Sequence, residues 1–285
     1  MARTKDIWLS AFTDPLACAT AFTPNICMAD LNGDGDYALL IADEKKNFRI
    51  WRGTSVKAQL QLVGVPSAAF QVYVENETPP QPWVGVLCDN AVFFYKSIGG
   101  VMKPRARFEL PDLEVKEGSD AGKKIKQIPT CMTTLHVLTQ TETEPSHIVI
   151  GTESKELFIL SPGVAKVLSV FTLPQVPTMI ACEGEFSVEY RIAISFRNGS
   201  IGVIRDQKLV PSVITTGTGI VGVGILNKRI YVARTDKLYE CYNLKGKCFF
   251  SLQLPAHCIA FEVMQMSQTR QFKGIILALD NGDVI

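Results

Sequence analysis

The sequence ADLNGDGDYALLIAD, residues 29–43, places four carboxylates, one carboxamide and two glycines between apolar residues. Calcium prefers such oxygen ligands, and an EF-hand loop supplies them at its positions 1, 3, 5 and 12, with glycine at position 6. Counted from Asp30, the stretch follows this pattern as far as Gly35, but Ile41 stands where the bidentate glutamate belongs. The stretch is therefore an incomplete calcium loop.

The same stretch resembles the D-x-N-G-D-G-x-x-D turn of integrin-type propellers, except that Ala38 replaces the last carboxylate. Asparagine and aspartate beside glycine also tolerate the left-handed conformations of tight turns. Two interpretations stay open, a calcium site and a turn that joins two strands. Both involve the same four side chains, Asp30, Asn32, Asp34 and Asp36.

Enzyme motifs are absent from the sequence, whether G-x-S-x-G, H-E-x-x-H or C-x-x-C. The segment GTGIVG at 217–222 has the letters of a dinucleotide fingerprint, but that site needs a helix after its glycines. Here the following residues alternate as strands do. The histidines, His136, His147 and His257, begin or lie within strand-like runs. We therefore expect a protein that is not an enzyme.

Composition and charge are those of a globular protein, since 47% of the 285 residues are hydrophobic and 20% are charged. The 29 basic and 28 acidic residues leave a net charge of +1, so no overall field attracts nucleic acid or a membrane. No apolar run reaches the ~20 residues of a membrane span, and the residues after Met1 do not form a secretory signal. We expect a soluble protein of a reducing compartment, with most of its eight cysteines in the core.

One pattern recurs six times along the chain: an apolar strand, a short polar turn and an alternating strand. These hairpins start about 40 to 60 residues apart, at Tyr37, Pro82, His147, Tyr190, Arg229 and Lys273. Between them lie two more strands, often joined at a proline corner. Four strands per unit at this period predict an all-β protein, a β-propeller of WD40-like four-stranded blades. The alternative, a β-sandwich, would not repeat one unit in this way.

The sixth unit stops in mid-strand at Ile285, so we expect 1–285 to be a single propeller domain that is truncated at its C-terminus. An open ring would expose strand edges, and the segment IWLSAFTDP at 7–15 is a candidate for closing it. Residues 111–128, rich in charge and glycine, predict a flexible rim loop. A solvated linker and a basic finger are the two interpretations of this loop.

Several segments resemble the propeller of the Bardet–Biedl syndrome 1 family of BBSome subunits. They are ADLNGDGDYALLIAD, GTESKELFIL, LPQVPTMIACEGEFSVEYRIAISFRNGSI and LALDNGDV. The likeness runs with interruptions from about Asp6 to the end of the chain. It implies a seven-bladed propeller without catalytic activity or cofactor, belonging to a coat-like complex that carries membrane proteins to and from cilia.

The resemblance also implies partners and a location. An Arf-like small GTPase in its GTP-bound state would recruit the complex to membranes through the first and last blades. Other BBSome subunits and the tails of membrane-protein cargo would bind as well, whereas nucleic acid would not, and contact with the membrane would be indirect. The implied location is the cytoplasm, the basal body, the cilium and the ciliary membrane.

Two departures from the family pattern affect the expected GTPase surface. The helical insertion after the second blade is replaced by the short segment 111–128, and the final blade is missing. As candidate GTPase contacts we choose the polar turn of the first hairpin, formed by Glu44, Lys45, Lys46, Asn47 and Arg49. A solvated turn is the alternative there. The competing function is a propeller that binds calcium or a small ligand, with hydrolase activity as a further option.

Overall fold

The computed structural model describes residues 19–74, 81–114, 124–135, 145–163, 166–205, 207–266 and 272–285. In these ranges the chain forms β-strands and one 3-10 turn, η1 (Thr23–Asn25). Five four-stranded antiparallel sheets follow one another along the chain, and a two-stranded sheet comes last. The prediction of four-stranded β units in tandem is thus confirmed. We call the six sheets blades 1 to 6.

Each blade is built from strands that are consecutive in sequence. Blade 1 contains β1 (Ile26–Ala29), β2 (Ala38–Ala42), β3 (Asn47–Arg52) and β4 (Ser55–Gln61). Blade 2 contains β5 (Pro66–Val72), β6 (Trp83–Cys88), β7 (Ala91–Ile98) and β8 (Val101–Glu109). Blade 3 contains β11 (Pro129–Leu135), β12 (His147–Thr152), β13 (Glu156–Leu160) and β14 (Val167–Thr172).

The remaining blades follow the same order. Blade 4 contains β15 (Pro177–Glu185), β16 (Glu189–Phe196), β17 (Ser200–Arg205) and β18 (Lys208–Thr215). Blade 5 contains β19 (Ile220–Leu226), β20 (Arg229–Arg234), β21 (Leu238–Asn243) and β22 (Cys248–Gln253). Blade 6 contains β23 (Cys258–Met266) and β24 (Phe272–Leu279) in the described part of the chain.

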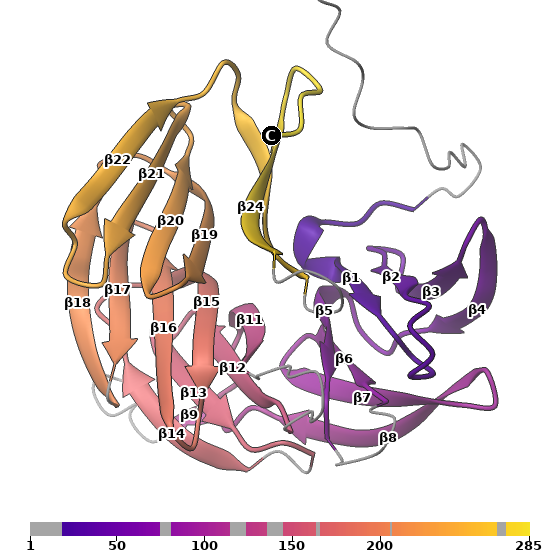
Figure 1. Ribbon diagram of the computed structural model, residues 1–285. Helices are drawn as coiled ribbons and strands as arrows, with labels where there is room; N and C mark the ends of the chain where they lie inside the picture. Colours follow the sequence, from indigo (N-terminus) through magenta and orange to yellow (C-terminus); the bar gives the residue numbers. More distant parts are fainter. Residues whose placement is uncertain are drawn as a thin grey trace, which may run out of the picture.

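The blades are arranged around a common centre, as Figure 1 shows. The first strand of each blade is innermost, and these strands contact one another in succession: β1 with β5, β5 with β11, β11 with β15, β15 with β19, and β19 with β23. The fourth strand of blades 1 to 5 lies at the circumference. This radial order is that of a β-propeller.

The predicted corners and hairpins lie where the sequence placed them. Five of the hairpins correspond to β2–β3, β6–β7, β12–β13, β16–β17 and β20–β21. In the sixth, the chain turns back after β24 and forms an isolated antiparallel bridge between Ala278 and Val284. Pro66 begins β5 and Pro177 begins β15, so each proline stands where the chain leaves an outer strand for the next inner one. Because proline cannot donate to a strand ladder, it fits this position at the start of a strand.

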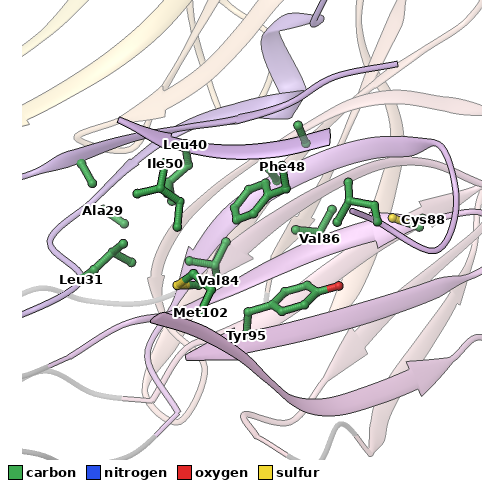
Figure 2. Close-up of a cluster of buried hydrophobic side chains, with 14 residues drawn as sticks. Ala29, Leu31, Leu40, Phe48, Ile50, Val84, Val86, Cys88, Tyr95 and Met102 are labelled. Atoms are coloured by element: carbon green, nitrogen blue, oxygen red, sulfur yellow. The ribbon is translucent and has the colours of Figure 1, made fainter. Parts of the chain in front are cut away.

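Apolar side chains fill the spaces between neighbouring blades. Figure 2 shows the cluster between blades 1 and 2, where Leu40, Phe48 and Ile50 face Val84, Val86 and Tyr95. The rings of Phe48 and Tyr95 stack with centroids 6.3 Å apart. Equivalent clusters lie between each later pair of blades. Blades 2 to 5 therefore bury both of their faces against neighbours, as in other radial repeat folds, and blades 1 and 6 each bury one face in this way.

The segment 111–128 forms a ladder at its described ends. β9 (Leu113–Glu114) pairs with β10 (Lys124–Ile125) in an antiparallel two-stranded sheet. The sequence did not indicate this pairing, because two-residue strands carry too little periodicity to detect. Residues 115–123 of the predicted rim loop lie outside the described residues, as does the segment 7–15 that was a candidate for closing the ring.

The structure also shows the surroundings of the glycine-rich segment GTGIVG and of the described histidines. GTGIVG leads into the strand β19 and not into a helix, so it lacks the helix N-terminus that would receive phosphates. His147 stacks on Phe186 with centroids 4.3 Å apart, and burial lowers its pKa. The ring Nδ1 of His257 lies 2.9 Å from the carbonyl oxygen of Thr235. His136 lies outside the described residues.

No helix among the described residues is both long and apolar enough to cross a membrane.

Candidate functional site

The acidic turn between β1 and β2 is closed by its own side chains. The carboxylate of Asp30 accepts the backbone N–H of Asp34 at 3.1 Å and that of Gly35 at 2.8 Å. The carboxylate of Asp34 accepts the N–H of Asp36 at 3.0 Å and the side-chain amide of Asn32 at 3.2 Å. Gly33 and Gly35 both adopt positive φ angles, 69° and 82°, which is why glycine follows Asn32 and Asp34 here.

Arg52, at the end of β3, supplies the positive charge of this turn. Its Nη2 donates to both carboxylate oxygens of Asp34, at 3.0 and 2.9 Å, and its Nε lies 3.1 Å from the Asp36 carboxylate. The hydrogen bond from Arg52 is the main reason why the pKa of Asp34 falls to about 2. Arg52 could not be recognised from the local sequence, because it lies 16 positions beyond Asp36 and meets the turn only through strand pairing.

These contacts bear on the calcium interpretation. Asp34 and Asp36 direct oxygens at a guanidinium, and Asp30 directs both of its oxygens at backbone N–H groups. Within the described ranges, no group of three or more His, Cys, Asp or Glu side chains is arranged to hold a metal ion. The geometry is that of a hydrogen-bonded turn, and calcium binding by Asp30, Asn32, Asp34 and Asp36 stays a hypothesis.

The candidate GTPase contacts occupy the turn between β2 and β3, which Asp43 organises. Asp43 is 1% exposed, and its carboxylate accepts the backbone N–H of Asn47 at 2.8 Å and the Asn47 amide at 3.1 Å. Arg49 lies 3.7 Å from the same carboxylate. Asp43 is not among the predicted contact residues, although an aspartate at the first position of a tight turn is a recognisable sequence signal.

The five chosen side chains differ in what they can offer a partner. Asn47 and Arg49 are half-buried and occupied by Asp43, while Lys46 adopts a φ of 66° and supplies backbone bonds within the turn. Glu44 and Lys45 are exposed, and no ion pair involves them among the described residues. Glu44 and Lys45 are therefore the two exposed members of the set.

The turn between the second and third strands has the same backbone geometry in blades 1, 3 and 5, but its side chains differ. Lys155 and Lys237 also have φ near 60°, and the carbonyl of each accepts the N–H of the leucine that follows the outer strand, as Lys46 does. The charged neighbours in those two turns are paired, however, Glu153 with Arg197 at 2.8 Å and Asp236 with Arg234. At the two positions before the left-handed lysine, blade 1 carries the charges of Glu44 and Lys45 without an ion-pair partner in the described structure, where blades 3 and 5 carry the paired Glu153 and Asp236.

The central cavity is lined by apolar, hydroxyl, carboxamide and thiol side chains and one carboxyl group among the described residues. It has a volume of about 640 Å³ and is lined by inner strands, including Thr130, Thr133 and Cys131 of β11 and Glu262 of β23. Withdrawal from water raises the pKa of Glu262, and burial raises the pKa of Cys131 to about 12. A thiol with such a pKa is protonated and unreactive at neutral pH. No histidine lines this cavity in the described structure.

Comparison with known proteins gives a consistent family assignment. The family described as ciliary BBSome complex subunit 1 matches residues 8–121 and 118–205. The junction of these two matches falls within the segment 111–128. Two curated relatives, both described as BBSome complex member BBS1, are similar over 97% of this chain: the mouse protein is 26% identical and the human protein 25%. The chain spans about half the length of these relatives, 56% of each.

Solved structures extend the likeness to the fold. A crystal structure of BBS1N in complex with ARL6DN, soaked with mercury, superposes on this chain with a TM-score of 0.87. It is 31% identical, and the match covers 97% of this chain and 82% of that one. A second crystal of the same complex, soaked with lead, gives the same TM-score at 32% identity.

Proposed function

Because the chain belongs to the ciliary BBSome complex subunit 1 family, we propose that it is a protein-binding propeller that acts within a BBSome complex. The blades form a rigid scaffold whose turns and edges are available for recognition. A role without catalysis is supported by the central cavity, whose titratable side chains among the described residues are Glu262 and the thiols of Cys27 and Cys131, both with raised pKa. The chain would carry out its function by holding other proteins in a fixed arrangement.

The partner we propose is an Arf-like small GTPase in its GTP-bound state. The observation that supports this proposal most directly is the likeness to BBS1N, which was crystallised with the Arf-like protein ARL6 and matches 97% of this chain at a TM-score of 0.87. GTP loading orders the switch segments of small GTPases, so the nucleotide state of such a partner would control binding. The propeller would then need only a preformed binding surface.

On this chain, we place the contact at the turn of blade 1. Asp43 holds the turn through the backbone of Asn47, so the ordering cost is already met when a partner arrives. Glu44 and Lys45 stand at its tip with opposite charges. Charges at the rim of an interface act mainly on partner choice and association rate.

Outside this contact, we propose that other BBSome subunits and the cytoplasmic tails of membrane-protein cargo bind the same scaffold. The chain would then work in the cytoplasm, at the basal body and at the ciliary membrane, and would reach the membrane indirectly through the GTPase. The balanced charge, +1 for 285 residues, supports this arrangement, because it provides no general attraction to lipid or nucleic acid.

A pulldown with the purified GTPase, locked either in its GTP or in its GDP state, tests the proposal. We expect the chain to be retained by the GTP state only, and double charge reversal in Glu44→Lys/Lys45→Glu to reduce retention. The matched control is Glu153→Lys/Ser154→Glu, which changes the same positions of the blade 3 turn. Equal retention by both nucleotide states, or none by either, would count against a GTPase role.

A further inference from the structure

The outer strands of the blades share a bulge that turns one side chain outward. In blades 1, 2, 3 and 5, the register between the third and fourth strands skips a single residue of the fourth. The skipped residues are Lys57, Arg105, Leu168 and Phe249. A bulge of this kind breaks strand pairing and redirects the side chain. In blades 1 and 2 this position carries a cation, as expected at a protected edge, whereas blade 3 carries the exposed Leu168 and blade 5 carries phenylalanine.

Phe249 is exposed in an unusual setting. Its side chain is 51% exposed, and the guanidinium of Arg229 lies 4.6 Å from the ring centroid. Phe250 and Leu252, by contrast, are opposite Cys241 and Tyr239 in the sheet, and Tyr239 packs against the cluster shared with blade 6. Phe250 also packs on the ring of Tyr239, with centroids 5.8 Å apart, whereas Leu252 is 53% exposed. Of the two phenylalanines, Phe249 is the one whose ring lies against a guanidinium.

The turn before Phe249 carries two lysines on a fixed backbone. The side-chain oxygen of Asn243 accepts the N–H groups of both Lys245 and Lys247, each at 2.9 Å. Gly246, at φ 84°, lies so close to blade 4 that an added Cβ would stand 2.1 Å from the carbonyl oxygen of Val213. Asn243 and the contact with blade 4 thus fix the backbone of the turn, so the backbone positions of its two lysines are defined.

The three cations here are uncompensated in the described structure. Arg229 pairs in register with Asn243, which brings it to the base of the same turn. No ion pair involves Arg229, Lys245 or Lys247 among the described residues, whereas Arg191 and Arg234 are both paired with carboxylates. An exposed aromatic ring thus lies against one cation, Arg229, and directly follows a turn that carries two more on an ordered backbone.

We propose that Arg229, Lys245, Lys247 and Phe249 form a docking surface for an acidic segment of a partner protein, one that places an apolar side chain between carboxylates. The cations match the carboxylates, and the free part of the Phe249 ring receives the apolar side chain. Three cations are fewer than the 4–8 that mark a lipid-binding cluster. The ring is also held beneath Arg229 and is not free to insert into a bilayer. This surface is separate from the blade 1 turn, so it does not depend on the GTPase proposal.

Fluorescence anisotropy of the purified full chain with a labelled peptide, Gly-Ser-Asp-Glu-Leu-Asp-Glu-Ser-Gly, tests this surface. We expect saturable binding that weakens with added salt, and a loss of about tenfold in Lys245→Glu/Lys247→Glu. Phe249→Ser should weaken binding several-fold and should remove the preference for this peptide over one with serine in place of leucine. The matched control is Arg105→Glu at the equivalent bulge of blade 2, which should bind as the unchanged chain does.

The results that would overturn the proposal are equally specific. They are an absence of binding by the unchanged chain, an equal loss in Arg105→Glu, or undiminished binding of a peptide whose acids are replaced by asparagine and glutamine. Vesicles of phosphatidylcholine and phosphatidylserine provide the last arm. If the chain binds these vesicles and Lys245→Glu/Lys247→Glu abolishes that binding, the surface recognises lipid and the proposal is wrong. Circular dichroism of each variant confirms that the fold is retained.

Discussion

At the scale of single residues, Arg52 gives the acidic turn its character. In the sequence alone, four acidic or amide side chains within seven residues resemble a cation-binding site. In the fold, one guanidinium donates to Asp34 and contacts Asp36, and Asp30 binds the backbone. The difference arises because hydrogen-bond partners from a neighbouring strand are invisible in local sequence. Ligand spacing alone therefore overstates the metal-binding potential of such turns.

The first prediction concerns the titration of Asp34. Its pKa lies at about 2, below the ordinary 3.8, mainly because Arg52 donates to it. A depressed pKa means that the ionised form stabilises the fold, so this contribution is complete above the ordinary value and is lost as the pH falls toward 2. In Arg52→Ala, we expect the Asp34 midpoint to rise toward 3.8, measured by NMR of the carboxyl carbon. Lys57→Ala, which removes a nearby exposed cation, should leave it in place.

The second prediction concerns calcium. If Arg52 satisfies Asp34 and Asp36, millimolar calcium should leave the melting temperature of the chain unchanged, because the ion would have to displace a guanidinium. Differential scanning fluorimetry with and without a chelator makes the measurement. A calcium-dependent rise that disappears in Asp34→Ala would instead support the ligand-binding alternative.

At the scale of elements, the hairpins could be predicted from sequence, whereas their turn geometry could not. Alternation and turn residues located all six hairpins, because both signals are local. The bulges and the left-handed lysines escaped detection. Lys46, Lys155 and Lys237 are not residues that signal a positive φ, and they adopt it because each carbonyl accepts the N–H of Leu62, Leu173 or Leu254 from the outer strand. Tertiary hydrogen bonds here outweigh local preference.

Gly222, in the apparent dinucleotide motif, and Gly224, just after it, are required by contacts with residues distant in sequence. A Cβ on Gly222 would stand 2.2 Å from the Cβ of Phe261, and one on Gly224 would stand 2.6 Å from Val263. These glycines allow β23 to approach β19 closely, which is a packing role and not a phosphate-binding one. The sequence correctly indicated strands there, but it could not reveal which strand lies against them.

The third prediction separates the architecture of the blade 1 turn from its surface. Asp43→Ala removes a buried carboxylate that accepts from Asn47 and lies near Arg49, so we expect a loss of about 2 kcal/mol in stability. Glu44→Ala, at the exposed neighbouring position, should change the free energy of unfolding by less than about 0.5 kcal/mol. Urea unfolding monitored by tryptophan fluorescence gives both values. A similar loss in the two variants would show that Asp43 does not organise the turn.

At the scale of the whole molecule, repetition made the architecture predictable. Because each unit buries its faces against the next, one pattern read six times specifies the radial order of the sheets. Repetition does not specify the side chains by which one blade differs from another at equivalent positions. Phe249 stands where blade 1 has Lys57, and the turn of blade 1 carries unpaired charges where blades 3 and 5 carry paired ones. Function in a propeller lies in such differences.

The fourth prediction follows from the charge of the molecule as a whole. With a net charge of +1, the chain should not associate with phosphatidylserine vesicles at physiological salt, where the Debye length is about 8 Å. Vesicles that carry the lipid-anchored GTPase in its GTP state should recruit it, and the GDP state should not. Cosedimentation measures the bound fraction, and Glu44→Lys/Lys45→Glu should reduce it. Recruitment by bare vesicles would show a direct membrane contact and would remove the need for the GTPase, because the propeller would then supply its own anchor.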